Sequence, residues 1–225
     1  MKIIKFIPNI LTLLNGFSGG LALVSAVEGN ALMTLIWVLV GVFFDSIDGM
    51  VARAFNATSE IGKQLDSLCD VITFGLVPGF IMYKYLYECL PYEFVPLSLL
   101  GFLITLAAIY RLARFNITSS SQLDFEGLPT PAFALFVVGI PFIPWTLDYT
   151  IIIALVALLT LLMVSNWMLP SQKFVDGKPT RFALIFAFIS LPILLWFRSQ
   201  ALSAIVLVYA VVGVVYMRIR NRQGQ

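Results

Sequence analysis

Long apolar runs separated by short polar breaks dominate this chain of 225 residues. Each run approaches the roughly 20 residues that a helix needs to cross the hydrocarbon core of a bilayer. The pattern therefore predicts an all-α polytopic membrane bundle, a single domain over 1–225, with about eight transmembrane helices. The predicted spans are 8–27, 31–52, 67–87, 96–115, 130–147, 149–168, 182–197 and 200–217. Pro141, Pro144 and Pro192 would kink or shorten two of these spans, so a count of six or seven also fits the sequence.

Composition strengthens the membrane interpretation and excludes several kinds of site. Hydrophobic residues make up 60% of the chain and charged residues 12%, whereas soluble domains have about 45–50% apolar and about 25% charged residues. A net charge of +2 with dispersed basic residues argues against a nucleic-acid partner. The chain has no histidine, and Cys69 and Cys89 are its two cysteines. The sequence thus supports neither a histidine-based metal site or triad nor a disulfide framework.

The basic residues predict an orientation. With eight spans, twelve of the fourteen Lys and Arg residues fall on the side of the N-terminus, and only Lys84 and Arg198 fall on the other. Cytoplasmic loops of membrane proteins carry the excess of Lys and Arg. We therefore predict a multi-pass protein of the cell membrane with both termini in the cytoplasm.

Four of the twelve acidic residues lie close together in the sequence, at Asp45, Asp48, Asp66 and Asp70. On helices, spacings of three and four place each pair on one face, about 60° and about 40° apart. Carboxylates close to hydrocarbon are costly and usually functional. A set of oxygen ligands selects Mg²⁺, Mn²⁺ or Ca²⁺ over zinc or copper. Two such ions would balance four negative charges and would suit phosphoryl displacement at the cytoplasmic end of the spans.

The residues around these aspartates favour a phosphate-containing ligand, although their spacing leaves alternatives open. Gly49, Ala52 and Gly62 are small and permit a close approach, and Arg53 carries a permanently charged fork suited to phosphate. Together they fit a nucleoside diphosphate bound through metal. The same acids would also fit solvated loop positions or a cation transporter, although a transport path would spread them along the depth of the membrane.

The segment 45–70 reads D-S-I-D-G-M-V-A-R-A-F-N-A-T-S-E-I-G-K-Q-L-D-S-L-C-D. It resembles the signature of the CDP-alcohol phosphatidyltransferase family, D-x2-D-G-x2-A-R-x8-G-x3-D-x3-D. Every fixed position is matched, by Asp45, Asp48, Gly49, Ala52, Arg53, Gly62, Asp66 and Asp70. The entry to the first span, Pro8 to Thr12, also resembles a recurrent segment of this family.

This resemblance implies an enzyme that moves a phosphatidyl group from a CDP-linked lipid to an alcohol and releases CMP. Asp70 would be the general base, and a homodimer would be the assembly. The implied ligands of two divalent cations (Mg²⁺ or Mn²⁺, with Ca²⁺ as an alternative at one position) are Asp45, Asp48, Asp66 and Asp70. The implied CDP-lipid site comprises Asn9, Thr12, Asp48, Gly49, Ala52, Arg53 and Gly62.

Two further segments, Y-R-L-A-R-F-N at 110–116 and F-E-G-L-P-T-P-A at 125–132, resemble the phosphatidylserine synthase branch of that family. The branch implies L-serine as the acceptor and CDP-diacylglycerol or CDP-archaeol as the donor. Arg111 or Arg114 would bind the serine carboxylate, and Asn116 and Glu126 would face its ammonium group. Either arginine would equally serve as a topological anchor or as a diphosphate ligand, and glycerol 3-phosphate or inositol acceptors remain alternatives within the family.

Overall fold

The computed structural model describes residues 6–117, 125–143, 148–170, 174–175, 178–179, 182, 186, 190 and 201–223. The chain divides into two compact units, Met1–Thr118 and Ser119–Gln225. The first unit contains the complete aspartate motif. A single domain over the whole chain stays a prediction.

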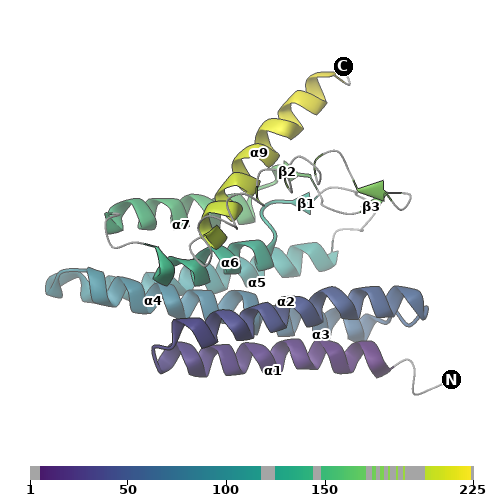
Figure 1. Ribbon diagram of the computed structural model, residues 1–225, viewed down its shortest axis with the longest axis horizontal. Coiled ribbons are helices and arrows are strands. Elements are labelled where there is room, and N and C mark those ends of the chain that lie inside the picture. Colours follow the sequence, from purple (N-terminus) through teal and green to yellow (C-terminus); the bar gives the residue numbers. More distant parts are fainter. Residues whose placement is uncertain are drawn as a thin grey trace. The chain divides into compact units, whose positions relative to one another are not determined.

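The first unit is built from helices (Figure 1). They are α1 (Ile7–Val27), α2 (Ala31–Ala54), α3 (Glu60–Asp70), the π-helical turn η2 (Val71–Leu76), α4 (Val77–Cys89), the 3₁₀ segment η3 (Tyr92–Phe102) and α5 (Leu103–Ile117). The continuous stretches Glu60–Cys89 and Tyr92–Ile117 are each long and apolar enough to cross a membrane, as are α1 and α2.

Local sequence sets the ends of these helices. Gly29 has a φ of +78°, a left-handed conformation that ends α1 at low steric cost. The side chain of Asn30 then accepts a hydrogen bond from the Met33 N–H at 3.0 Å and caps α2. Ser59 caps α3 in the same way through the Gly62 N–H at 3.1 Å. The Ser59 cap follows the short turn after Ala54 that reverses the chain between the two halves of the aspartate motif.

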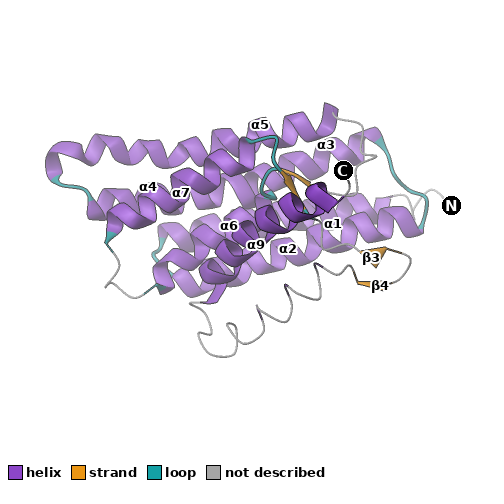
Figure 2. Cartoon of the chain, turned by 90° about the horizontal axis from the view of Figure 1, so that it is seen from above, coloured by secondary structure: helices purple, strands orange, loops and turns teal. Residues whose placement is uncertain are grey.

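Helices α1 and α2 pack side by side along the first unit (Figures 1 and 2). Ala22 and Val38 are fully buried, while Leu13, Phe17 and Phe43 are largely exposed. A helix that keeps small residues inside and presents large apolar side chains outward is suited to a lipid environment.

The π-helical turn η2 interrupts the third long helix immediately after Asp70. The hydroxyl of Thr73 within this turn donates to the Asn15 carbonyl of α1 at 3.0 Å. On the other side, the Thr105 hydroxyl of α5 donates to the Gly75 carbonyl at 3.0 Å. The turn is therefore anchored to two neighbouring helices. Such π-helical turns within α-helices frequently lie at functional sites.

The second unit contains α6 (Thr130–Gly139), the 3₁₀ turn η4 (Ile140–Phe142), α7 (Tyr149–Val164) and α9 (Ala201–Gln223). Strand β1 (Phe125–Glu126) pairs antiparallel with β2 (Met168–Leu169), and β3 (Phe174–Val175) with β4 (Lys178–Pro179). The Ser203 hydroxyl of α9 donates to the Phe136 carbonyl of α6 at 2.8 Å. Asp148 caps α7 through the N–H and hydroxyl of Thr150, both at 2.8 Å, and these bonds hold the pKa of its carboxyl below the ordinary value.

The predicted all-α membrane architecture is confirmed in its main features. Five helices in the described part of the chain are long and apolar enough to span a bilayer, and Thr130–Phe142 and Tyr149–Val164 are shorter apolar helices. Helix α6 is shorter than the predicted span 130–147, because the chain turns through η4 at Pro141, which cannot continue the helical hydrogen bonds. The predicted span 182–197 lies almost entirely outside the described residues. A total of eight spans stays a prediction.

A glycine pair tests the packing of α1 against η2. A Cβ on Gly19 would lie 2.9 Å from the Thr73 Cα, whereas a Cβ on Gly20 would meet nothing within 4 Å. We expect Gly19→Ala to destabilise the protein by about 1–3 kcal/mol through overpacking. The matched Gly20→Ala should be neutral or slightly stabilising, because Ala favours a helix by about 1 kcal/mol over Gly. Thermal unfolding in detergent, followed by circular dichroism, measures both; equal melting temperatures would contradict this packing.

Candidate active site

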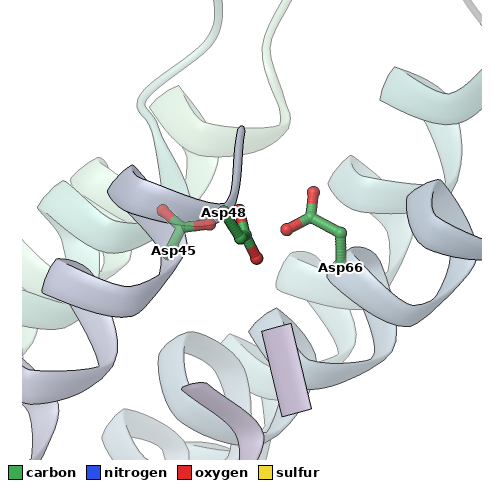
Figure 3. Close-up of side chains that lie close together, drawn as sticks. All are labelled: Asp45, Asp48 and Asp66. Carbon is green, nitrogen blue, oxygen red and sulfur yellow. The ribbon is translucent and has the colours of Figure 1, made fainter. Parts of the chain in front are cut away.

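Three aspartates from two helices converge in the first unit. Asp45 and Asp48 lie on α2 and Asp66 lies on α3, and each offers a carboxylate oxygen within 4.8 Å of the others. Figure 3 shows the Asp66 carboxylate pointing across the gap toward the other two. Asp48 is buried, and Asp45 and Asp66 are half-buried. Three like charges this close repel one another strongly where water is scarce, so the cluster fits a divalent cation with hard oxygen ligands.

Asp70, the fourth predicted ligand, joins the cluster from the end of α3. Its side chain is 6% exposed, and its carboxyl lies close enough to that of Asp45 for the two groups to interact electrostatically. A side-chain amide of α1 also donates to it, since Asn15 Nδ2 lies 2.9 Å from Asp70 Oδ1. The structure thus brings the four predicted aspartates together and bonds Asp70 to α1.

Thr12 of α1 supports the cluster from a third helix. Its hydroxyl lies 2.5 Å from Asp48 Oδ2 and 3.0 Å from the Pro8 carbonyl. A hydroxyl has one proton to donate, and the carboxylate is the stronger acceptor. The resemblance assigns Thr12 to the CDP-lipid site, and in this structure its hydroxyl donates to Asp48. It therefore positions a motif carboxylate.

A cavity of about 160 Å³ opens beside the aspartate cluster, and Asp48 and Asp66 form part of its wall. The residues predicted for a CDP-linked lipid all line it: Asn9, Thr12, Asp48, Gly49, Ala52, Arg53 and Gly62. Five more lining residues were not predicted, namely Pro8, Ala57, Thr58, Ser59 and Lys63. Gly62 keeps the cavity open, because a Cβ there would lie 3.0 Å from Ser59 Oγ and 3.1 Å from Asn9 Oδ1. The structure thus gathers the small residues of the motif around one space.

Two cations, Arg53 and Lys63, line this cavity together with Asp48 and Asp66. Lys63 pairs with Glu60 at 2.9 Å, but both side chains are largely exposed. Such a surface ion pair is weak, so Lys63 can exchange Glu60 for an anionic ligand. Lys63 could have been predicted from the sequence, because it directly follows the motif glycine Gly62.

The residues predicted for serine fall in both units. Arg111 is buried and Arg114 is half-buried on α5. The amide of Asn116, at the end of the same helix, donates to the Ser67 hydroxyl at 2.9 Å. This contact ties the end of α5 to the residue that follows Asp66. Glu126 belongs to strand β1 of the second unit.

The sequence analysis missed Asn15, which is fully buried and bonded to Asp70. A signal for it exists in the sequence: Asn9, Thr12, Asn15 and Ser18 recur every third position along an otherwise apolar helix. Such spacing turns each successive side chain by about 60°, so these residues form a polar stripe that winds around α1. A polar stripe on a membrane helix generally faces the protein interior.

The aspartate cluster should bind a divalent cation. We expect Asp66→Asn to weaken Mn²⁺ binding about 10–100-fold, the range that loss of a partner at a metal site costs. Glu60→Gln, an exposed acid on the same helix, is the matched control and should bind as the parent does. Electron paramagnetic resonance of free Mn²⁺, titrated with purified protein in detergent, measures the affinity. Equal affinities for the two variants would exclude Asp66 as a ligand.

Known proteins resemble this chain over most of its length. The family model for CDP-alcohol phosphatidyltransferase matches residues 5–164. An archaetidylserine synthase of Methanothermobacter thermautotrophicus is 38% identical over 138 residues, which is 60% of this chain and 58% of that protein. CDP-diacylglycerol–serine O-phosphatidyltransferases of Helicobacter pylori and Methanocaldococcus jannaschii are each 32% identical, over 92% and 94% of this chain and 89% and 94% of their own lengths. Together with the aspartate cluster, these matches show that the chain belongs to the CDP-alcohol phosphatidyltransferase family.

Proposed function

We propose that this protein transfers the phosphatidyl or archaetidyl group of a CDP-linked lipid to the hydroxyl of L-serine and releases CMP. The main supporting observation is that the three aspartates converge beside one cavity, lined by every residue predicted for the donor. The relatives described above carry serine transferase or archaetidylserine synthase names. They support serine as the acceptor and leave diacyl and ether-linked donors both in scope.

The donor would enter the cavity with its diphosphate toward the aspartates. Arg53 lines this cavity, and a guanidinium binds phosphate oxygens through two parallel hydrogen bonds. Gly49, Ala52 and Gly62 leave room for the cytidine and the diphosphate because their side chains are small or absent. Thr12 keeps Asp48 oriented at the cavity wall.

The aspartates fit divalent cations, and we propose Mg²⁺ or Mn²⁺, with Ca²⁺ as an alternative at one of two positions. Asp45, Asp48 and Asp66 would hold them, joined by Asp70. When bound, such cations stabilise the negative charge that grows on the phosphate oxygens as CMP leaves.

Asp70 would act as the general base. It would take the proton of the serine hydroxyl as that oxygen forms a bond to the β-phosphorus of the donor, the one that carries the lipid. The bond from this phosphorus to the CMP oxygen breaks, and CMP leaves as the anion. We propose direct transfer, since the aspartates already serve as cation ligands and base. A positioned base of this kind is worth about 10²–10⁴-fold in rate.

We propose that the acceptor site lies at the end of α5. Arg111 or Arg114 would bind the serine carboxylate, and Asn116 would face the ammonium group. The hydrogen bond between Asn116 and Ser67 supports this proposal, because it holds the end of α5 next to the residue after Asp66. A role for Glu126 at the ammonium group stays a prediction from the sequence.

The long apolar helices make this a membrane protein, and we propose that both termini and the active site face the cytoplasm. The excess of Lys and Arg in the loops on that side supports this orientation. The reaction would then occur where soluble serine meets the headgroup of the donor. The homodimer that the family resemblance implies stays a prediction.

An acceptor screen tests the proposed function directly. Purified protein in detergent with Mg²⁺ or Mn²⁺ should release CMP from CDP-diacylglycerol or CDP-archaeol when L-serine is added, and not with glycerol 3-phosphate or inositol. Exhaustive chelation should abolish release, and the added cation should restore it. If CMP is released with another acceptor and not with serine, the serine assignment is wrong, and the transfer from a CDP-linked lipid to an alcohol still stands.

The acceptor site makes a separate prediction about α5. We expect Arg111→Lys, which keeps the charge but loses the planar fork, and Arg114→Ala to raise the KM for serine about tenfold, the effect of losing one hydrogen bond to a charged group. The KM for the CDP-lipid should stay nearly constant. Arg218→Lys, which alters a cation over the Trp167 ring in the second unit, is the control. A change confined to the CDP-lipid KM would assign both arginines to the diphosphate.

A further inference from the structure

Asn15 is the fully buried member of the polar stripe on α1 that contacts Asp70. Its side-chain amide donates from Nδ2 to Asp70 Oδ1 at 2.9 Å, and its exposed fraction is zero. An amide does not titrate in water, so it supplies a hydrogen-bond donor without competing for the proton that a base must accept.

The surroundings of Asn15 hold it in place. Its backbone carbonyl accepts hydrogen bonds from the Ser18 hydroxyl at 2.7 Å and from the Thr73 hydroxyl at 3.0 Å. On the side of α2, a Cβ on Gly41 would lie 3.1 Å from Asn15 Oδ1 and 3.0 Å from Ser18 Oγ. The residue is thus enclosed by three elements, and its side chain has little freedom to turn away from Asp70.

Thr73 links this enclosure to the chain around Asp70. Asp70 is the last residue of α3, and the π-helical turn η2 begins at Val71. Asn15 therefore holds both the carboxylate of Asp70, through its amide, and the turn that follows Asp70, through its carbonyl. One bond that Asn15 donates holds the carboxylate itself, and one that it accepts holds the turn from which Asp70 extends.

Stability alone does not explain an asparagine at this position. Its Oδ1 is buried and has no hydrogen-bond partner among the described residues, and a buried polar atom without a partner costs free energy. Leucine, which is similar in shape, would suit an apolar helix better. The free-energy cost of the unpartnered Oδ1 therefore suggests that the site requires the Nδ2 donor of Asn15.

We propose that Asn15 is a positioning residue for the transfer reaction: it fixes Oδ1 of Asp70 so that the second carboxylate oxygen can take the acceptor proton. The inference rests on the proposed function, because it assigns a role relative to Asp70 as base. With this role for Asn15, helix α1 orients two different aspartates. Thr12 orients Asp48 beside the donor cavity, and Asn15 orients Asp70.

Two near-isosteric substitutions test this role. Asn15→Leu removes the donor, and Asn15→Asp replaces it with an acceptor that repels Asp70. We expect each to lower kcat about 100-fold, the cost of misplacing a catalytic group by roughly 1 Å. The KM for the CDP-lipid and its affinity, measured by calorimetry with Mg²⁺ present, should stay within about twofold, because Asn15 does not line the cavity.

Matched variants separate positioning from folding. Ser25→Ala removes the hydroxyl of another buried residue of α1, which donates to the Leu21 carbonyl, and it should leave kcat unchanged. Asp70→Asn should lose turnover completely and still bind the CDP-lipid, which sets the limit for a lost base. Melting temperatures in detergent, together with CDP-lipid binding, identify any variant that has failed to fold.

The outcomes distinguish this inference from the proposed function. If Asn15→Leu folds and turns over within twofold of the parent, Asn15 is a packing residue and the inference is wrong. Equal losses of CDP-lipid binding and of turnover in well-folded Asn15→Leu and Asn15→Asp would also overturn it, since they would place Asn15 in the donor site. If the parent releases no CMP with any acceptor, the proposed function fails before Asn15 is tested.

Discussion

Repulsion among carboxylates in an apolar bundle is the constraint on which the rest of this structure depends. Asp45, Asp48 and Asp66 place oxygens within 4.8 Å of one another, between helices whose outer faces carry large apolar side chains. Such a cluster is stable only if positive charge and hydrogen-bond donors compensate it. The first unit supplies the donors from α1 and leaves a cavity with Arg53 and Lys63 at the cluster. The clustered carboxylates thus provide the cation ligands for catalysis, and their mutual repulsion is also what requires cations and hydrogen-bond donors nearby.

Helix α1 contributes no acid, yet it orders the acids of two other helices. Its polar stripe meets Asp48 through Thr12 and Asp70 through Asn15, while Asn9 lines the donor cavity. Glycines allow this close approach, since a Cβ on Gly19 or Gly41 would collide with Thr73. Small residues between helices and polar groups directed inward are how membrane bundles achieve specificity without a hydrophobic driving force. The first helix is therefore a template for the site.

Hydropathy predicted the membrane fold well, because every long apolar run must satisfy its backbone hydrogen bonds internally and so becomes a helix. The residues that the family resemblance assigns to the CDP-lipid all line one cavity. Helix ends were harder to predict. The third long helix begins at Glu60, seven residues before the predicted start, because the Ser59 cap starts it in a polar segment that hydropathy assigns to a loop. The π-helical turn after Asp70 has no hydropathy signal, since it depends on partners in α1 and α5.

The sequence by itself determined the family, the helical membrane architecture and the oxygen-ligand chemistry, because residue types and their spacing along one helix are local properties. Only the tertiary structure decided how the residues divide the work. It assigned the Thr12 proton to Asp48, tied Asn116 to Ser67 and joined Asn15 to Asp70. These pairs lie 36, 49 and 55 positions apart. Side chains that far apart in sequence meet only when helices pack, and that packing depends on the glycines and hydroxyls between them.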